Sequence, residues 1–193
     1  MTVETALAFK FDANLHEYVV EATGEVLPHI TGLLERSGLV DDRWYTEESR
    51  DRGTAVHQLT ADFDLKLIDL NSCVSRVRPY LLAHVDAMKV VKPELLHVEE
   101  PHVHRRLRFG GRPDRIVKVY GQRATWELKS GPPERSHPIQ TALQAILDSD
   151  RCGLPPDSIA RYCCYLKPNG KYTVERHLKV GDFDEALRII KRF

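Results

Sequence analysis

The chain has 193 residues, 42% hydrophobic and 29% charged, which is typical of a globular protein with one sizeable core. Its 28 basic and 28 acidic residues cancel, so nucleic acid or a membrane would have to be bound through a local patch. No apolar run approaches the ~20 residues of a membrane span, and the opening "MTVETALAFKFD" lacks a secretory signal pattern. We expect one cytoplasmic domain over residues 1–193.

The N-terminal part of the chain is predicted to contain two strands followed by helices. "FKFDANLHEYVVEATGEVLPHIT" indicates two strands around a turn at Ala22–Glu25. "TGLLERSGL" predicts a short helix that ends near Gly38, and "WYTEESRDRGTAVHQLTADFDLKL" predicts two helical pieces that pivot near Gly53. Pro79 suits the first position of a helix over "PYLLAHVDAMKVV".

The remaining part is predicted to be mostly strands with one inserted helix. The predicted strands are "LLHVEEPHVHRRLRF", "DRIVKVY", "ATWELK", and then "RYCCYLK" and "KYTVERHLK" around a "PNG" turn. "SHPIQTALQAILDSD" predicts a helix whose apolar face consists of Ile139, Ala142, Leu143, Ile146 and Leu147. With a final helix in "GDFDEALRIIKRF", we expect a mixed α/β fold: a central mixed, mostly antiparallel sheet flanked by helices.

The segment "GGRPDRIVKVYGQRATWELKSG" predicts a hairpin that carries two acids and a lysine. With the tip at Gly121–Gln122, Asp114 faces Lys129 and lies diagonal to Glu127, within roughly 7–8 Å. Glu127 and Lys129 are two residues apart, so they share a strand face. Two such carboxylates suit a divalent cation such as Mg²⁺, and the Leu128 carbonyl could add another oxygen.

A lysine beside a metal can orient a water or neutralise charge that builds on a phosphate. The ordinary alternative is a Pro-Asp turn followed by a Glu-x-Lys strand that faces solvent.

These motifs in this order resemble the PD-(D/E)XK nuclease superfamily, which implies a restriction-endonuclease-like core. "GRPD", a hairpin-length gap and "WELKSG" match its central motif. "RGTAVH" is similar to the first motif of the RecB-like branch, and "HPIQTALQ" stands where that branch has a Gln-x-x-x-Tyr helix. "LPHITGLLERSGLVD" with "RDRGTAVH" is similar to the opening of phage and prophage nucleases of this type, and the resemblance covers residues 15–150.

The resemblance implies a metal site that holds Mg²⁺ or Mn²⁺, as one or two ions. Its ligands would be Asp114, Glu127 and His57. Lys129 would be the catalytic lysine that positions or activates the attacking water. Family members often add an acid from the preceding strand, which here is Glu99 or Glu100, and the sequence does not decide between them.

Two groups of residues are expected to hold substrate. Gln140 matches the glutamine of the last motif, while Gln144 replaces its tyrosine, a departure that concerns base or sugar packing and not the metal chemistry. The stretch "HRRLRFGGRPDR" has five arginines that could neutralise phosphates, with a solvated strand edge as the alternative: Arg105, Arg106, Arg108, Arg112 and Arg115. Strand alternation would place Arg106 and Arg108 on one face.

Histidines and cysteines elsewhere give no further metal site. His102 and His104 have a spacing that can bind zinc, but no third or fourth ligand is evident, so we expect solvated or phosphate-contacting side chains. The four cysteines lack both a CxxC zinc pattern and the iron–sulfur arrangement of some RecB-like nucleases: Cys73, Cys152, Cys163 and Cys164. We expect reduced thiols and no iron–sulfur cluster.

The sequence therefore predicts a metal-dependent DNA nuclease of RecB-like, phage or prophage type. The resemblance implies an exonuclease with little sequence specificity that leaves a 5′-phosphate, in recombination or DNA processing. Its partners besides DNA would be a phage recombinase or a single-strand-binding protein. The alternatives are an endonuclease for branched or flapped DNA, and an inactive module that binds nucleic acid or docks a partner. Polarity, strand preference and oligomeric state stay open.

Overall fold

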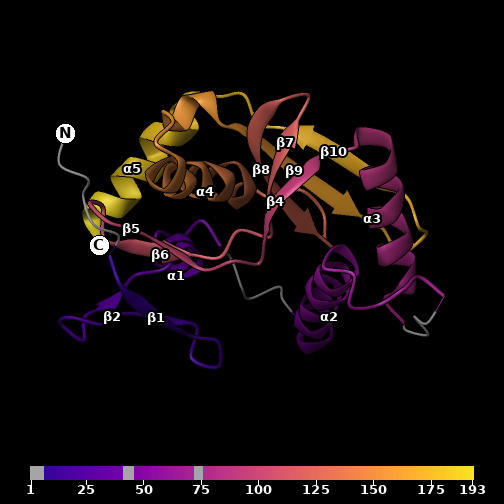
Figure 1. Cartoon of the computed structure of the whole chain (residues 1–193), viewed down its shortest axis with the longest axis horizontal. Coiled ribbons are helices and arrows are strands. Elements are labelled where there is room, and N and C mark those ends of the chain that lie inside the picture. Colours follow the sequence, from indigo (N-terminus) through magenta and orange to yellow (C-terminus); the bar gives the residue numbers. More distant parts are fainter. Residues whose placement is uncertain (1–6, 41–45, 72–75) are drawn as a thin grey trace.

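The computed structural model describes residues 7–40, 46–71 and 76–193; Cys73 and the first two residues of the predicted "WYTEES" helix lie outside these ranges. A five-stranded sheet in the order β10-β9-β8-β7-β4 forms the centre of the fold (Figure 1). Its strands are β4 (Glu94–Val98), β7 (Arg115–Val119), β8 (Gln122–Lys129), β9 (Ala160–Leu166) and β10 (Tyr172–Arg176). Only β8 and β9 run parallel. The expected fold class, a mixed and mostly antiparallel sheet flanked by helices, is confirmed.

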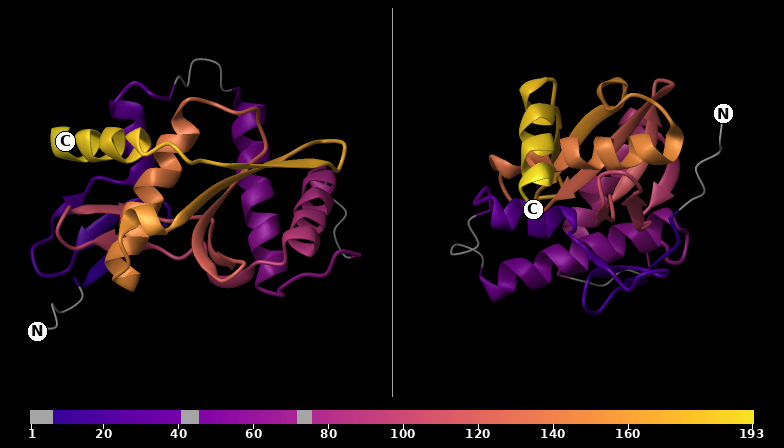
Figure 2. Two further views of the ribbon diagram at one scale, coloured as in Figure 1. Left: turned by 90° about the horizontal axis from the view of Figure 1, so that it is seen from above. Right: turned by 90° about the vertical axis from the view of Figure 1, so that its left-hand side faces the viewer.

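Helices cover both faces of this sheet. On one face, α2 (Glu47–Asp64) and α3 (Arg78–Val91) pack on a core that includes Trp126 and Leu128 of β8. On the other face lies α4 (Ser136–Cys152), which packs against α1 (Ile30–Arg36) and α5 (Gly181–Arg192) (Figure 2). Within the described ranges, no helix combines the length and the apolar character that a membrane span requires.

The helix α2 is one continuous helix, so the prediction of two pieces that pivot near Gly53 is wrong. It begins after Thr46, whose hydroxyl accepts a hydrogen bond from the Ser49 backbone N–H at 3.1 Å. A glycine inside a helix costs only about 1 kcal/mol. Burial of Val56 and Thr60 further along the same helix is enough to offset a cost of that size.

The N-terminal segment forms three strands where two were predicted: β1 (Phe9–Asp12), β2 (Glu17–Val20) and β3 (Val26–Leu27). The extra turn arises because Asp12 accepts hydrogen bonds from the N–H groups of Asn14 and Leu15. This sheet packs on a second hairpin, β5 (His102–His104) and β6 (Phe109–Gly111). A Cβ at Gly110 would lie 2.4 Å from the Tyr18 ring, so only glycine permits this packing.

The β7–β8 hairpin differs from its predicted register by two residues. Its tip is Tyr120 and Gly121, with φ of 49° and 81°, as expected of a two-residue turn. Arg115 pairs with Trp126, and the same register carried one residue further puts Asp114 opposite Glu127. Side chains alternate with a period of two, so the error left every side chain on its predicted face.

A buried arginine ties α2 and α3 to β7. Arg115 is fully buried, and its Nε donates to Asp64 Oδ2 at 2.6 Å. Its other nitrogens donate to the Asp114 carbonyl at 2.6 Å and to the Thr60 hydroxyl at 3.3 Å. His84 of α3 lies 3.0 Å from both oxygens of Asp64, so one carboxylate partners two buried side chains.

We predict that Asp64→Asn destabilises the protein by about 3–5 kcal/mol, because it removes the nearest counter-charge of the buried Arg115 guanidinium and leaves only Glu99, at 3.7 Å. Urea unfolding of the variant should show a lower midpoint with an unchanged m-value. Asp86→Asn is the matched control, since Asp86 is exposed on α3 and should change stability little.

The same carboxylate should make stability depend on pH. Burial alone would raise the pKa of Asp64, but His84 and Arg115 outweigh it and hold this pKa below its ordinary value. A lowered pKa contributes stability that is fully present above about pH 4 and is lost as pH falls through the folded-state pKa. Wild type should therefore lose more stability than Asp64→Asn below that pH, and equal losses would contradict the assignment.

Candidate metal centre

Three side chains from separate segments converge at one end of the central sheet. His57 of α2 places its Nδ1 3.0 Å from Asp114 Oδ1 and 3.6 Å from Glu99 Oε1. One nitrogen or oxygen from each side chain lies within 4.8 Å of the others. Asp114 is buried, while His57 and Glu99 are partly exposed, so the cluster lies at the base of an opening to solvent.

The backbone explains why these three meet. His57, Thr60 and Asp64 are spaced three and four residues apart, so the α2 face that binds Arg115 also carries His57. Glu99 follows β4 in a left-handed conformation (φ 49°), and its N–H donates to the Asp114 carbonyl at 3.0 Å. Asp114 is fixed in turn, because its Oδ2 accepts the Leu128 N–H at 2.6 Å. The Leu128 backbone thus meets Asp114 through its N–H.

Glu99, and not Glu100, lies in this cluster. Glu100 turns away and pairs with His97 Nδ1 at 2.5 Å and with Arg151 Nη1 at 3.3 Å. The Glu99 carboxylate is held by Arg112 Nε at 3.1 Å on Oε2. The sequence could not separate the two acids, because only the positive φ at Glu99 decides which one faces Asp114.

Glu127 and Lys129 form a second group beside the cluster. Lys129 Nζ lies 2.9 Å from Glu127 Oε1 and donates to Gln140 Oε1 at 2.8 Å. The amides of α4 also bind this acid: Gln140 Nε2 donates to Oε1 at 2.6 Å and Gln144 Nε2 to Oε2 at 2.5 Å. Both oxygens of Glu127 are therefore engaged by the lysine and the two glutamines.

The charges of the two groups are coupled. Burial raises the pKa of Glu127, the Asp114 carboxylate raises it further, and Lys129 only partly opposes them. Burial opposes charge on Lys129, but Glu127 and Asp114 raise its pKa, so the ammonium stays charged. Burial likewise opposes charge on His57, yet Asp114 with Glu99 raises its pKa to about 10. The site favours positive charge beside its acids, which a proton or a metal cation can supply.

The cluster fits a divalent cation. Glu99 Oε1 is buried without a hydrogen-bond partner and lies on the side of His57 and Arg115. A buried acceptor without a partner costs about 1–3 kcal/mol, which metal coordination would remove. One imidazole nitrogen with carboxylate oxygens is a donor set that suits Mn²⁺ or Mg²⁺.

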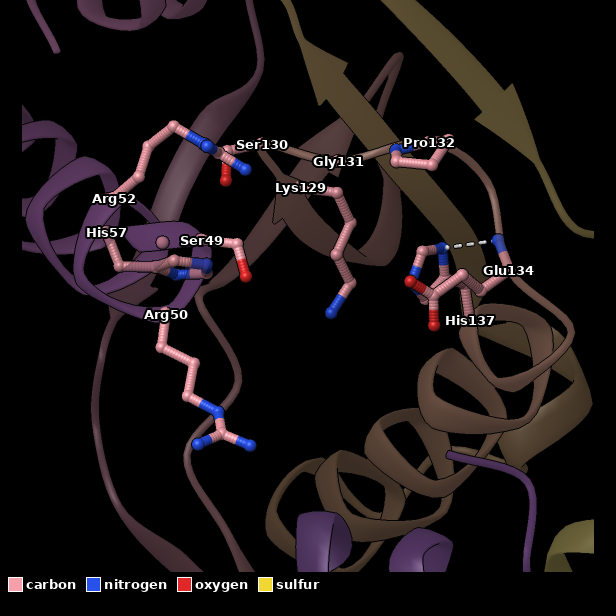
Figure 3. Close-up of a pocket in the computed structure, with 11 residues that line it drawn as sticks. Ser49, Arg50, Arg52, His57, Lys129, Ser130, Gly131, Pro132, Glu134 and His137 are labelled. Atoms are coloured by element: carbon pink, nitrogen blue, oxygen red, sulfur yellow. Dashed lines mark hydrogen bonds between the residues drawn. The ribbon is translucent and has the colours of Figure 1, made fainter. Parts of the chain in front are cut away.

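Two neighbouring cavities, together called the groove, lie beside His57 and are lined by residues that the sequence did not indicate. One cavity of about 220 Å³ lies between α2 and the segment after β8, with Arg50, Arg52 and Lys129 on its walls (Figure 3). A neighbouring cavity of about 330 Å³ shares Arg50, Lys129 and His137. Arg50 and His57 stand seven residues apart, so helical spacing within "RDRGTAVH" was the signal that could have found Arg50.

The basic stretch after β5 is not the continuous strand that was predicted, while its contact with phosphates stays a prediction. Residues 105–108 form the turn between β5 and β6, so Arg106 and Arg108 do not alternate on a strand. Most of its arginines are engaged within the protein. The pairs are Arg105 with Asp150, Arg108 with Glu25, Arg112 with Glu99, and Arg115 with Asp64.

His104 is buried and His102 is only partly exposed, so neither is the freely solvated side chain that was one expectation, and phosphate contact stays a prediction. Their nearest ring nitrogens lie 3.7 and 3.6 Å from Asp150, and burial lowers the pKa of both. His104 is buried, and its Nδ1 accepts the Leu107 N–H at 3.2 Å. Three of the cysteines lie in the described part of the chain and are free thiols: Cys152, Cys163 and Cys164.

Comparison with solved structures gives distant likenesses. No protein-family model and no curated protein sequence matches this chain. A solved structure with a similar arrangement is an alkaline exonuclease from Laribacter hongkongensis, which is 11% identical with a TM-score of 0.45. The similarity covers 85% of this chain and 84% of that one. A likeness this distant bears on neither the reaction nor the substrate.

We predict that Gln144→Leu raises the pKa of Glu127, because it removes a hydrogen bond that lowers this pKa. The buried oxygen that loses its donor should also cost about 1–3 kcal/mol of stability. Carboxyl ¹³C NMR across a pH titration measures the first effect, and urea unfolding measures the second.

Gln58→Leu is the matched control, since Gln58 bonds Asp62 on the exposed face of α2 and should change neither quantity much. An unaltered Glu127 titration in the Gln144 variant would contradict the role of this amide.

Proposed function

We propose that this chain is a metal-dependent DNA nuclease that hydrolyses phosphodiester bonds. The observation that carries the proposal is the cluster of His57, Glu99 and Asp114, whose ligand atoms lie within 4.8 Å of one another. The position of the cluster supports the same function, because the charged Lys129 lines the groove together with His57 of the cluster. Sequence motifs that resemble the PD-(D/E)XK superfamily lie on the same residues and add support.

Each side chain has a distinct role in this proposal. His57, Glu99 and Asp114 hold the cation, which when bound would lower the pKa of a water and stabilise charge on the phosphate. Lys129 directs its ammonium at the attacking water or at a phosphate oxygen. Glu127 and Gln140 fix that ammonium in place, since both lie within 2.9 Å of Nζ.

Two roles are compatible with Glu127, which are metal binding and the positioning of Lys129. The sequence motif assigns it to the metal, but its two oxygens are engaged by Lys129 and the amides of Gln140 and Gln144. We propose that Glu127 positions Lys129 and that it reaches a second cation only if these bonds exchange.

The groove suits a DNA backbone. Arg50 and Arg52 line it next to Lys129, where they can neutralise phosphates. We propose an exonuclease of RecB-like type with little sequence specificity, because phosphate contacts carry no base information. We propose that it works in the cytoplasm, as a single domain, in phage-type recombination or DNA processing.

The competing proposal is a module that binds DNA or a partner without cleaving. The presence of Asp114, Glu127, Lys129 and His57 together favours the enzyme, since inactive relatives usually lose the acid or the lysine.

We predict that purified protein degrades labelled DNA in Mg²⁺ or Mn²⁺ and that EDTA stops it. Lys129→Ala should lower the rate by ~10²–10³, the usual cost of removing one group that acts in the transition state. Calorimetry should show that this variant still binds Mn²⁺, whereas His57→Ala binds it more weakly.

Lys118→Ala is the matched control, because Lys118 pairs with Glu94 on the neighbouring strand and lies outside the site. Metal-dependent DNA binding without cleavage by wild type would favour the inactive module. Cleavage of circular or branched DNA at the rate of linear DNA would favour an endonuclease.

A further inference from the structure

Outside the groove, a further cavity of about 440 Å³ lies on the opposite side of the N-terminal turn of α4. Arg135, Pro138 and Ile139 line this cavity, whereas Ser136, His137 and Gln140 line the groove. At 3.6 residues per turn these two sets point to opposite sides of α4. The rest of the cavity wall is residues 175–179, which are the end of β10 and the segment after it, together with Asp182 of α5.

The charge in this cavity is mostly positive. Arg135 and Lys179 are exposed on its wall, whereas the Arg176 guanidinium turns to the other face of the sheet, where it donates to Gln122 at 3.3 Å and lies over the Tyr162 ring. Of its two acids, Asp182 is already paired with the buried Arg161 at 3.0 Å, so only Glu175 opposes the two basic groups.

Two helix N-termini add to that charge. Residues of the first turns of α4 and α5 both line the cavity, and neither helix has a side-chain cap. The N-terminal end of a helix carries a partial positive charge and presents N–H groups that bind anions.

A buried histidine on the wall lacks one partner. His177 is 7% exposed, and its Nδ1 lies 2.8 Å from the Thr141 hydroxyl. Its Nε2 has no hydrogen-bond partner, and the nearest acid, Glu175 of the same wall, is 3.9 Å away. Leaving a buried polar atom without a partner costs about 1–3 kcal/mol, so a ligand that accepts or donates a hydrogen bond here would be stabilised.

We propose that this cavity binds a backbone phosphate of the DNA strand, on the far side of α4 from the cleavage site. The proposal rests on the proposed nuclease function. A helix is about 10–12 Å across with its side chains, so a strand that crosses the end of α4 would pass both the groove and this cavity. The second contact would hold the strand while the first is cleaved.

The first experiment uses inorganic phosphate and the full chain without metal. In a ¹H–¹⁵N NMR titration, we expect phosphate to shift the amides of residues 135–139 and 177–182. The double variant Arg135→Ala and Lys179→Ala should lose these shifts, because both side chains are exposed cations of the wall. The double variant Lys10→Ala and Lys89→Ala, which removes two exposed cations elsewhere, should keep them. Shifts confined to the Lys129 groove would overturn the site.

The second experiment measures binding of single-stranded DNA in EDTA at several salt concentrations. Loss of one phosphate contact should make the slope of log affinity against log salt shallower by about 0.7 in the Arg135 and Lys179 variant. Phosphate binding with an unchanged DNA slope would overturn the assignment to DNA and leave a site for free phosphate. Neither experiment requires cleavage, so a failure of the nuclease proposal shows separately, in the EDTA-sensitive degradation assay.

Discussion

The Arg115 guanidinium is the group on which the geometry of the candidate site depends. A buried charge costs several kcal/mol unless it is paired. Here the Arg115 guanidinium donates hydrogen bonds to the Asp64 carboxylate, the Thr60 hydroxyl and the Asp114 carbonyl. Those contacts fix α2 against the start of β7. Because His57 lies on the same face of α2, the ion pair that stabilises the core also sets the distance from His57 to Asp114.

Alternation along β8 places its core side chains on one face of the sheet and its candidate catalytic side chains on the other. Trp126 and Leu128 enter the core under α2 and α3, while Glu127 and Lys129 face α4. The two faces remain linked through one residue, since the Leu128 N–H holds Asp114 in place. A change in the core at Leu128 would therefore move a carboxylate of the site.

Helix α4 contributes to the candidate site on its inner face and to two openings at its first turn. Its inner face supplies Gln140 and Gln144, whose amides donate hydrogen bonds to the buried Glu127 carboxylate without adding charge. Its first turn lies between the groove and the 440 Å³ cavity, with His137 on the side of the groove and Arg135 on the side of that cavity. A rigid helix between two basic openings is a physical reason to expect one strand to contact both, as we propose.

The sequence by itself determined the fold class and most of the candidate site. Strand alternation has a period of two, so Asp114, Glu127 and Lys129 kept their faces even though the predicted hairpin register was two residues off. His57 was found only through its resemblance to a known motif, because a lone histidine on a helix carries no chemical signal.

The tertiary structure decided what depends on contacts between distant segments. It placed Glu99 in the cluster and Glu100 outside it, through one backbone angle. In the folded chain, most arginines of the basic stretch also form ion pairs with acids that lie far from them in sequence, such as Glu25 and Asp150. Local pattern fixes which face a side chain occupies, but its partner depends on which segments pack together, and that is a property of the whole fold.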